Sequence, residues 1–307
     1  MLKQVLEIYE LLDSAHVTGA KVADLLRSRG IADVTVTTVE GRNGSTDFVK
    51  AVIPGGPGPT LGVIGRLGGI GARSERLGLV SDADGAVAAL AVALKLADMR
   101  AAGDELPGTV IVATHICPDA PTRPHHPVAF MGSPVDTAAM NRYEVDPRMA
   151  AILSIDTTKG NRICNHKGIA ISPTVKAGWI LKVADALLDI YSWTAGRSPV
   201  VLPITMQDIT PYGNDVFHLN SILQPCTVTP APVVGVAITA ESAVPGCATG
   251  ASHATDIELA ARFCVEVAKA FTAGACPFYD VDEVAHLERL YGPMTRLQTL
   301  GEGGTDN

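Results

Sequence analysis

The sequence is poor in charge, in aromatic residues and in long apolar runs. Of its 307 residues, 18% are charged and 5% are aromatic, against roughly 25% charged residues in typical soluble domains. No basic run occurs and the formal net charge is −8, which argues against a nucleic-acid partner. The longest apolar stretches, 85–94 and 231–240, are far shorter than the roughly 20 residues of a membrane span. We therefore expect neither nucleic acid nor membrane as a partner.

Cysteine spacing and the first residues indicate the cell compartment. The six cysteines are scattered and form no CxxC pair, so neither a disulfide framework nor a cysteine zinc site is expected. The opening MLKQVLEIYE contains two glutamates and no apolar core, unlike a secretory signal. Hydrophobic residues reach 47%, enough for a sizeable core. We expect a cytoplasmic protein, and its low charge favours a homo-oligomer.

Strand and helix patterns alternate along the chain. Runs rich in β-branched residues predict strands over 33–40, 48–53, 60–66, 109–114, 151–156, 167–172, 200–206 and 233–238. Apolar residues at helical spacing predict helices over 2–12, 19–28, 82–101, 174–190, 254–272 and 280–291. This alternation predicts an α/β fold with a mostly parallel, mixed sheet and helices on both faces. We expect a single domain over 1–299 with irregular loops at 116–150 and 239–252, and a disordered tail over 300–307.

Polar side chains lie where the predicted strands end and where the predicted helices begin. In open α/β sheets the ligand crevice lies beyond the carboxyl ends of the strands. The candidates at these positions are Arg66, Asp82, Asp84, His115, Cys117, Asp119, Asp156 and His253. Carboxylate and imidazole together are a usual ligand set for zinc or a similar divalent ion. The sequence therefore indicates a polar, metal-compatible site at one edge of the sheet.

Each candidate also has a purely structural interpretation. Asp82 could be a helix N-cap, since Asp is favoured there, and His253 could simply begin its helix. Cys117 could fill the core, as most buried cysteines do. His125 and His126 lie among prolines, which is typical of a surface loop. The glycines Gly68, Gly69 and Gly71 are similar to a phosphate-binding loop, but no lysine follows them.

The order of motifs between residue 5 and about 272 resembles that of the zinc-dependent exopeptidases, nearest to the glutamyl-aminopeptidase/endoglucanase-like aminopeptidases. The matching segments are GVIGRLGGIG at 62–71, SDADGAVAALAVALKLA at 81–97, VATHICPDA at 112–120, ILSID at 152–156, HKGIAIS at 166–172, Gly213-Asn214-Asp215 and SHATDIELA at 252–260. Within that superfamily the chain most resembles the domain-of-unknown-function 1177 family, over its whole length. That family name implies no function.

The resemblance implies metal ligands and also shows where this chain departs from the pattern. Asp82, Asp156 and His253 match three of the usual five ligand positions. Arg66 takes the place of the first histidine ligand, and Cys117 falls near the place of the glutamate pair. The short segment between 71 and 82 leaves no room for an inserted lid domain. The resemblance thus implies one metal rather than two.

The leading hypothesis is a metal-dependent hydrolase of a small amide or peptide-like substrate. Asp82, Asp156 and His253 would hold one divalent ion, zinc or a similar metal, which would activate water. The proton would be moved by His115, Cys117 or Asp119. A substrate carboxylate would bind Arg66, and Asp84, Asn214 and Asp215 complete the predicted substrate-binding set.

Two other hypotheses remain open. The protein could be a metal-free binding or regulatory protein on a degenerate peptidase fold, because the guanidinium of Arg66 is unfavourable beside a metal ion and could itself neutralise Asp82 and Asp156. Alternatively, Cys117 and His115 could form a nucleophile pair, since residues two apart in an extended segment point the same way.

Overall fold

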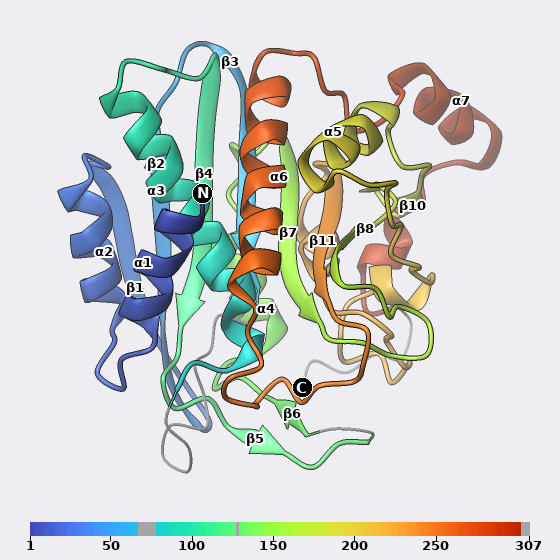
Figure 1. Ribbon diagram of the computed structural model, residues 1–307. Helices are drawn as coiled ribbons and strands as arrows, with labels where there is room; N and C mark the ends of the chain where they lie inside the picture. Colours follow the sequence, from blue (N-terminus) through green and yellow to red (C-terminus); the bar gives the residue numbers. More distant parts are fainter. Residues whose placement is uncertain (67–77, 127–128, 302–307) are drawn as a thin grey trace.

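The computed structural model of the chain describes residues 1–66, 78–126 and 129–301. Its centre is a mixed sheet in which the described strands follow the order β1-β2-β4-β3-β7-β11-β9-β10, with β8 also paired to β11 (Figure 1). These strands are β1 Asp33–Gly41, β2 Gly44–Ile53, β3 Gly58–Gly65, β4 Gly108–Ile116, β7 Ala151–Thr158, β8 Gly168–Ile171, β9 Val175–Lys176, β10 Trp179–Ile180 and β11 Val233–Thr239. A separate small hairpin pairs β5 Thr122–Arg123 with β6 Phe130–Met131.

The four central strands run in one direction. β3 is parallel to both β4 and β7, and β11 is parallel to β7. The flanking pairs β1–β2, β2–β4 and β8–β11 are antiparallel. The carboxyl ends of β4, β7 and β11 therefore meet at one edge of the sheet, the lower edge in Figure 1. The α/β, mixed-sheet prediction is confirmed.

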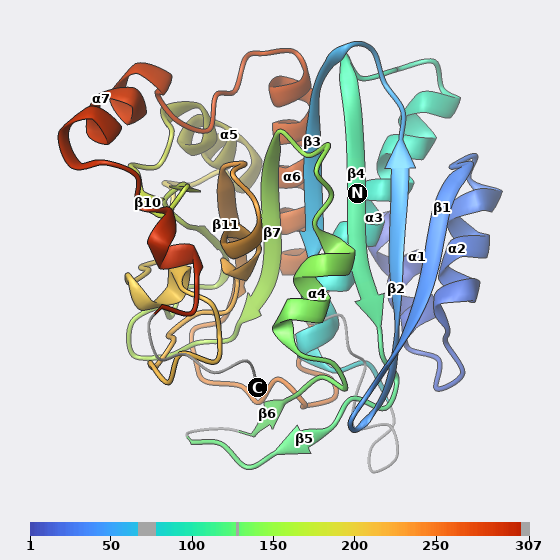
Figure 2. The ribbon, with the colours of Figure 1, turned by 180° about the vertical axis from the view of Figure 1, so that it is seen from behind.

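Helices cover both faces of this sheet. On the face seen in Figure 1 lie α1 Leu2–Leu12, α3 Asp84–Ala101, α5 Asp185–Ala195 and α6 Ala254–Thr272. The opposite face carries α4 Thr137–Glu144 (Figure 2). The remaining helices are α2 Gly19–Ser28 and α7 Val281–Tyr291, with 3₁₀ turns at Ser81–Ala83, Gln207–Ile209, Gln224–Val228 and Thr295–Gln298.

Helix α3 is the most deeply buried of these helices, because its small side chains let it lie close to the sheet. Gly85 at its start is so close to β7 that an added Cβ would lie 2.8 Å from the carbonyl oxygen of Ile155. Its alanines between 86 and 93 are fully buried between the sheet and the neighbouring α1 and α6. This close packing fixes the start of α3, and with it Asp82 and Asp84, against the ends of the central strands.

Two predicted elements are wrong. The helix expected over 174–190 begins only at Asp185, because Ala177 and Gly178 form a tight turn between β9 and β10. Both have positive φ, 48° and 83°, as a two-residue type I′ hairpin turn requires. The strand expected over 200–206 is reduced to a single bridge from Val201 to Ile171, since Pro203 cannot donate to a strand ladder.

Other predictions concern segments that were expected to be irregular or terminal. The 116–150 segment contains α4 and the β5–β6 hairpin in addition to loops. Residues 302–307 of the predicted tail, and the glycines Gly68, Gly69 and Gly71, lie outside the described residues. In the part of the chain that is described, no helix is long and apolar enough to cross a membrane.

Candidate functional site

The carboxyl edge of the sheet carries a buried cluster built around Glu144. The Arg66 guanidinium, which directly follows β3, donates one hydrogen bond to Glu144 and another, of 3.1 Å, to Asn141 Oδ1. The second carboxylate oxygen of Glu144 lies 2.6 Å from Nδ1 of His115, near the end of β4. Arg66, His115 and Glu144 are all almost completely buried. The charge of Arg66 is therefore paired inside the protein.

Local structure explains why Glu144 and Asn141 reach Arg66 together. They are three residues apart on α4, so their side chains share one helix face. Asp136 caps this helix by accepting a hydrogen bond of 2.7 Å from the Ala139 amide. Burial favours the neutral acid of Glu144, but Arg66 and His115 outweigh it and hold the pKa of Glu144 below its usual value. Glu144 is therefore an ionised carboxylate inside the protein.

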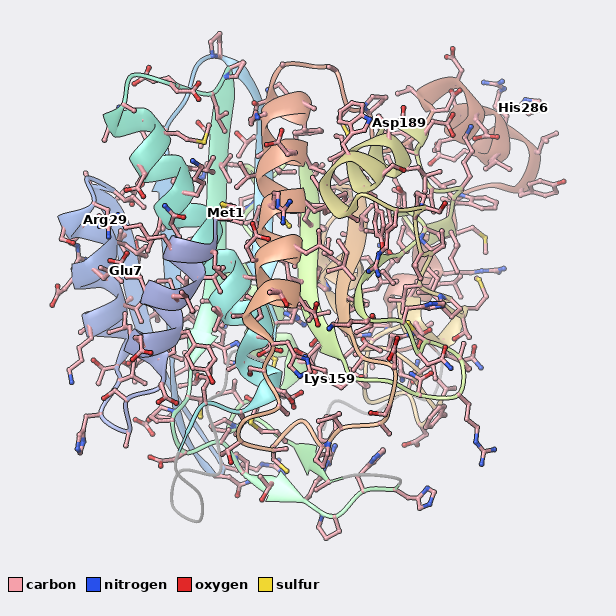
Figure 3. The ribbon with its side chains drawn as sticks, viewed as in Figure 1. Met1, Glu7, Arg29, Lys159, Asp189 and His286 are labelled. Atoms are coloured by element: carbon pink, nitrogen blue, oxygen red, sulfur yellow. The ribbon has the colours of Figure 1, made fainter. Side chains whose placement is uncertain are left out.

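A second buried ion pair joins Asp84 and Lys159. Lys159 follows β7, and its Nζ lies 2.7 Å from Asp84 Oδ2 at the start of α3. Both side chains are excluded from solvent. Figure 3 shows Lys159 at the lower edge of the sheet, beneath the start of α6. Burial raises the pKa of Asp84, and the Lys159 charge opposes that rise. The side chain of Ser252 opposes the rise in the pKa of Asp84 as well.

Asp82 and Asp156 lie between these two pairs. Burial, together with repulsion from Asp156 and Asp84, raises the pKa of Asp82 to about 8. Burial likewise raises the pKa of Asp156 to about 6, although Asp156 accepts hydrogen bonds from the Thr157 amide (2.7 Å) and Ser221 Oγ (3.0 Å). Within the described residues, neither carboxylate has an ion-pair partner. The charge of Lys159 acts on Asp82 and that of Arg66 on Asp156, but among the described residues neither cation forms an ion pair with them.

The loop before α6 covers Asp82. The Asp82 amide donates to the Gly246 carbonyl at 3.1 Å, and its carboxylate packs so tightly on Gly246 that an added Cβ would lie 2.3 Å from it. Asp82 belongs to the 3₁₀ turn that precedes α3. The N-cap residue of α3 is Ala83, and no side chain caps this helix. Its place is therefore not that of a capping residue.

His253 is the N-cap residue of α6, and its side chain does not cap the helix. Its Nδ1 lies 3.6 Å from Asp256 Oδ2, and 54% of its side chain is exposed. In the structure as described, 67–77, 127–128 and 302–307 excepted, no three His, Cys, Asp or Glu side chains form a group that could hold a metal ion. Asp82, Asp156 and His253 are accordingly not drawn together around one point in this conformation.

Cys117 belongs to a small apolar cluster that Cys247, next to Gly246, packs against. The Cys117 thiol donates to the Ser45 carbonyl at 3.5 Å and packs with Val80, Ala120 and Met131. Burial raises the pKa of Cys117 to about 12, so the thiol is protonated at neutral pH and is a poor nucleophile. Asp119 is exposed on the following loop.

Asn214 and Asp215 occupy a surface turn. The Asn214 amide donates to Thr210 Oγ1 at 2.8 Å, and its oxygen accepts from the Val216 amide. Asp215 is exposed and has a φ of 59°. These contacts are local, so the turn uses Asn214 for its own conformation.

Three polar residues of this cluster were not anticipated from the sequence, namely Glu144, Asn141 and Lys159. Glu144 and Asn141 belong to α4, in the segment expected to be irregular, and the available signal was the N-capping Asp136. Lys159 comes three residues after the predicted strand 151–156, so its position at the sheet edge could be expected, although its partner Asp84 could not.

One protein-family model matches most of this chain. The model described as "Protein of unknown function (DUF1177)" matches residues 37–301. The chain belongs to the DUF1177 family. The predicted family resemblance is therefore confirmed, and no curated protein matches the chain.

Solved structures show which fold this DUF1177 member has. It is similar to the bottromycin maturation enzyme BotP, with a TM-score of 0.56 and 16% identity over 89% of this chain and 70% of the other. A BotP structure in complex with Mn gives 0.53 and 14% over 87% and 70%. Cytosol aminopeptidase from Coxiella burnetii gives 0.53 and 14% over 86% and 68%. At these identities the likeness shows a peptidase-like α/β fold, as predicted, and nothing further.

Proposed function

We propose that this protein is a metal-dependent hydrolase of a small amide or peptide-like substrate, with one divalent ion held at Asp82 and Asp156. One observation carries the proposal. Among the described residues, the buried carboxylates Asp82, Asp84, Asp156 and Glu144 lie at this edge, and the buried cations Arg66 and Lys159 are already paired with Glu144 and Asp84. The two carboxylates left over repel each other, so a bound cation would relieve an unfavourable charge.

The donor chemistry fits a hard divalent ion. Mg²⁺ and Mn²⁺ favour carboxylate oxygens and water, and Mg²⁺ is commonly held by only one or two carboxylates. Asp82 and Asp156 are such a pair, whereas an imidazole-rich site would favour zinc. His253, half-exposed beside the cluster, remains the third proposed ligand. The Mn²⁺ of the BotP complex supports an ion of this kind, and zinc is the less favoured choice.

The protein's own groups would then position and move protons. A divalent ion, when bound, lowers the pKa of a water ligand and polarises a carbonyl. Ser221 and the Thr157 amide fix the orientation of the Asp156 carboxylate. Because the ionised Glu144 can only accept, Nδ1 of His115 carries the proton. Nε2 of a neutral His115 is then the nitrogen that can accept a proton, which makes His115 the proposed general base.

The same geometry weighs against two other roles. Arg66 is buried against Glu144 and Asn141, so we propose that it positions Glu144 and does not bind a substrate carboxylate. The metal-free hypothesis needs an unpaired cation for an anionic ligand, and in the described part of the chain the buried cations Arg66 and Lys159 are each paired with a carboxylate. Asp84 is likewise engaged by Lys159, and Asn214 and Asp215 are proposed only as the rim of the substrate pocket.

The test is hydrolysis by tag-free protein that has been stripped with chelator and then reloaded. We expect turnover of some dipeptides or small amides with Mn²⁺, none after stripping, and none in Asp82→Asn. The matched control is Asp24→Asn, because Asp24 is an exposed residue of α2 with 76% of its side chain accessible. Equal turnover by stripped and reloaded protein would exclude a metal-dependent reaction.

A further inference from the structure

A cavity of about 570 Å³ lies between α4 and the residues that lead into β7 and β11, on the face of the sheet shown in Figure 2. This volume falls within the range of about 300–1,000 Å³ that is typical of small-molecule sites. We call it the α4 cavity. Neither Asp82 nor Asp156 is among its lining residues, so it is distinct from the proposed metal site. Its lining includes Arg142, Val145, Met149, Lys176, Pro230 and Tyr279.

Hydrogen bonds between its walls fix the shape of the α4 cavity. Asn141, which also lines it, donates through Nδ2 to the Gln224 carbonyl at 3.1 Å and to Thr227 Oγ1 at 3.3 Å. These bonds tie α4 to the 3₁₀ turn that leads into Pro230. On another wall, Lys176 Nζ donates to the Pro230 carbonyl at 2.8 Å. The cavity is therefore formed before any ligand arrives, which lowers the free-energy cost of binding.

Two cations in this lining have no carboxylate partner. The Arg142 guanidinium lies 5.7 Å from the centre of the Tyr143 ring, and Lys176 Nζ lies 5.0 Å from the centre of the Tyr279 ring. Among the described residues, neither cation forms an ion pair. Burial lowers the pKa of Lys176, and the charge of Glu288 opposes that change. An anion in the cavity would therefore meet two cations that are not yet paired.

A smaller cavity elsewhere on the protein has cations that are already paired. Its volume is about 290 Å³, and its lining includes Arg29 and Arg100. Arg29 pairs with Glu7 and Asp98. Arg100 pairs with Glu105. Cations that line a cavity in this protein can thus find carboxylates within the chain, and in the described part of it those of the α4 cavity do not.

We propose that the α4 cavity binds a small carboxylate with an apolar body. Arg142 would hold the carboxylate, because a guanidinium can donate two parallel hydrogen bonds to it. Lys176 would add a second positive charge. Val145 and Met149 line the same cavity, and their apolar side chains suit a hydrocarbon body better than a hydrated inorganic anion. This site does not depend on metal binding by Asp82 and Asp156.

The test is calorimetric titration of the full chain with phenylacetate, and with phenylacetamide as an uncharged ligand of similar shape. We expect saturable binding of phenylacetate, and binding of the amide that is weaker by about tenfold or more. Arg142→Gln should weaken phenylacetate binding by about tenfold or more, because the charge-assisted hydrogen bonds are lost. Arg100→Gln is the matched control, because Arg100 lines the smaller cavity and pairs with Glu105. It should bind phenylacetate as the wild type does.

The outcomes distinguish this site from other sources of carboxylate binding. No saturable binding at millimolar phenylacetate would overturn the proposal, and so would equal binding by the wild type and a folded Arg142→Gln protein. A carboxylate held at the proposed metal site would still bind to Arg142→Gln, so that result would also count against the α4 cavity. Inorganic phosphate that binds as tightly as phenylacetate would contradict the role of the apolar lining. Loss of binding in Lys176→Met as well as in Arg142→Gln would support a site built from both cations.

Discussion

The carboxylate of Glu144 accepts hydrogen bonds from Arg66 and His115 at the same time, and all three side chains are buried. This contact joins the ends of β3 and β4 to α4 on the opposite face of the sheet. It also fixes the ring of His115 and removes Arg66 from contact with solvent. The stability of the site and the orientation of its proposed base therefore depend on one carboxylate.

Replacing Glu144 with Gln should destabilise the protein strongly. The substitution leaves the buried Arg66 guanidinium without its counter-charge, and breaking a buried pair in this way costs about 3–5 kcal/mol. Urea unfolding would measure the change. Glu105→Gln is the control, because the Arg100–Glu105 pair is largely exposed and contributes about 0–1 kcal/mol. Similar losses in both variants would contradict the account of Glu144.

Mn²⁺ affinity should rise with pH until Asp82 is fully ionised. Protons compete with the metal for this carboxylate, whose pKa is about 8, so affinity should increase about tenfold per pH unit between about pH 6 and 8 and then level off. Below the Asp156 pKa of about 6 the slope should steepen. Calorimetric titration at several pH values measures this. A flat profile between pH 6 and 8 would exclude Asp82 as a ligand.

The metal-free protein should lose stability as pH rises from about 4 to about 8. The pKa of Asp82 is raised on folding, from 3.8 to about 8, so the folded state binds more protons than the unfolded chain across that interval. Ionising Asp82 therefore costs free energy only in the folded state. Thermal unfolding of stripped protein should show the fall, and saturating Mn²⁺ should suppress it. A Tm that fell equally with and without Mn²⁺ would contradict this linkage.

Gly246→Ala should weaken metal binding. Its new Cβ would lie 2.3 Å from the Asp82 carboxylate, so either that carboxylate or the covering loop must move. Mn²⁺ titration should show a loss of affinity of about tenfold or more, equivalent to about 1.4 kcal/mol. Gly132→Ala is the control, because its Cβ would come no closer than 3.3 Å to its nearest neighbour, the Pro121 carbonyl. Unchanged affinity in Gly246→Ala would show that Asp82 does not bind the ion.

Cys117→Ser should keep its hydrolytic activity. The thiol is buried, its pKa is raised to about 12, and it donates to the Ser45 carbonyl, so it has no thiolate with which to attack a substrate. Turnover of the substrate found in the metal-dependence screen measures the effect. Loss of turnover in a folded Cys117→Ser protein would revive the cysteine mechanism.

The parts of the site that the sequence could predict are those governed by local rules. Asp156 ends a run of apolar β-formers and Asp82 precedes an alanine-rich helix, so both were expected at the carboxyl edge of the sheet, where they lie. Lys159 was visible beside them, but its partner Asp84 comes from a distant segment, and sequence spacing does not reveal such pairings. Arg66 was assigned to the substrate because Glu144, its actual partner, was not anticipated.

The incorrectly predicted elements have similarly local causes. Residues 174–190 have apolar spacing that suits a helix, but the turn at Ala177 and Gly178 needs positive φ at both positions. Helix α4 has only eight residues, too short for apolar periodicity to identify it. Its stability comes from the Asp136 cap and from contacts made after folding.

The most direct test of the account is the metal content of tag-free protein, measured by mass spectrometry after reconstitution with Mn²⁺ and removal of excess ion. The account predicts about one Mn²⁺ per chain in the wild type and in Asp24→Asn, and none in Asp82→Asn or Asp156→Asn. Wild-type protein that binds no ion, or an Asp82→Asn protein that still binds one, would contradict it.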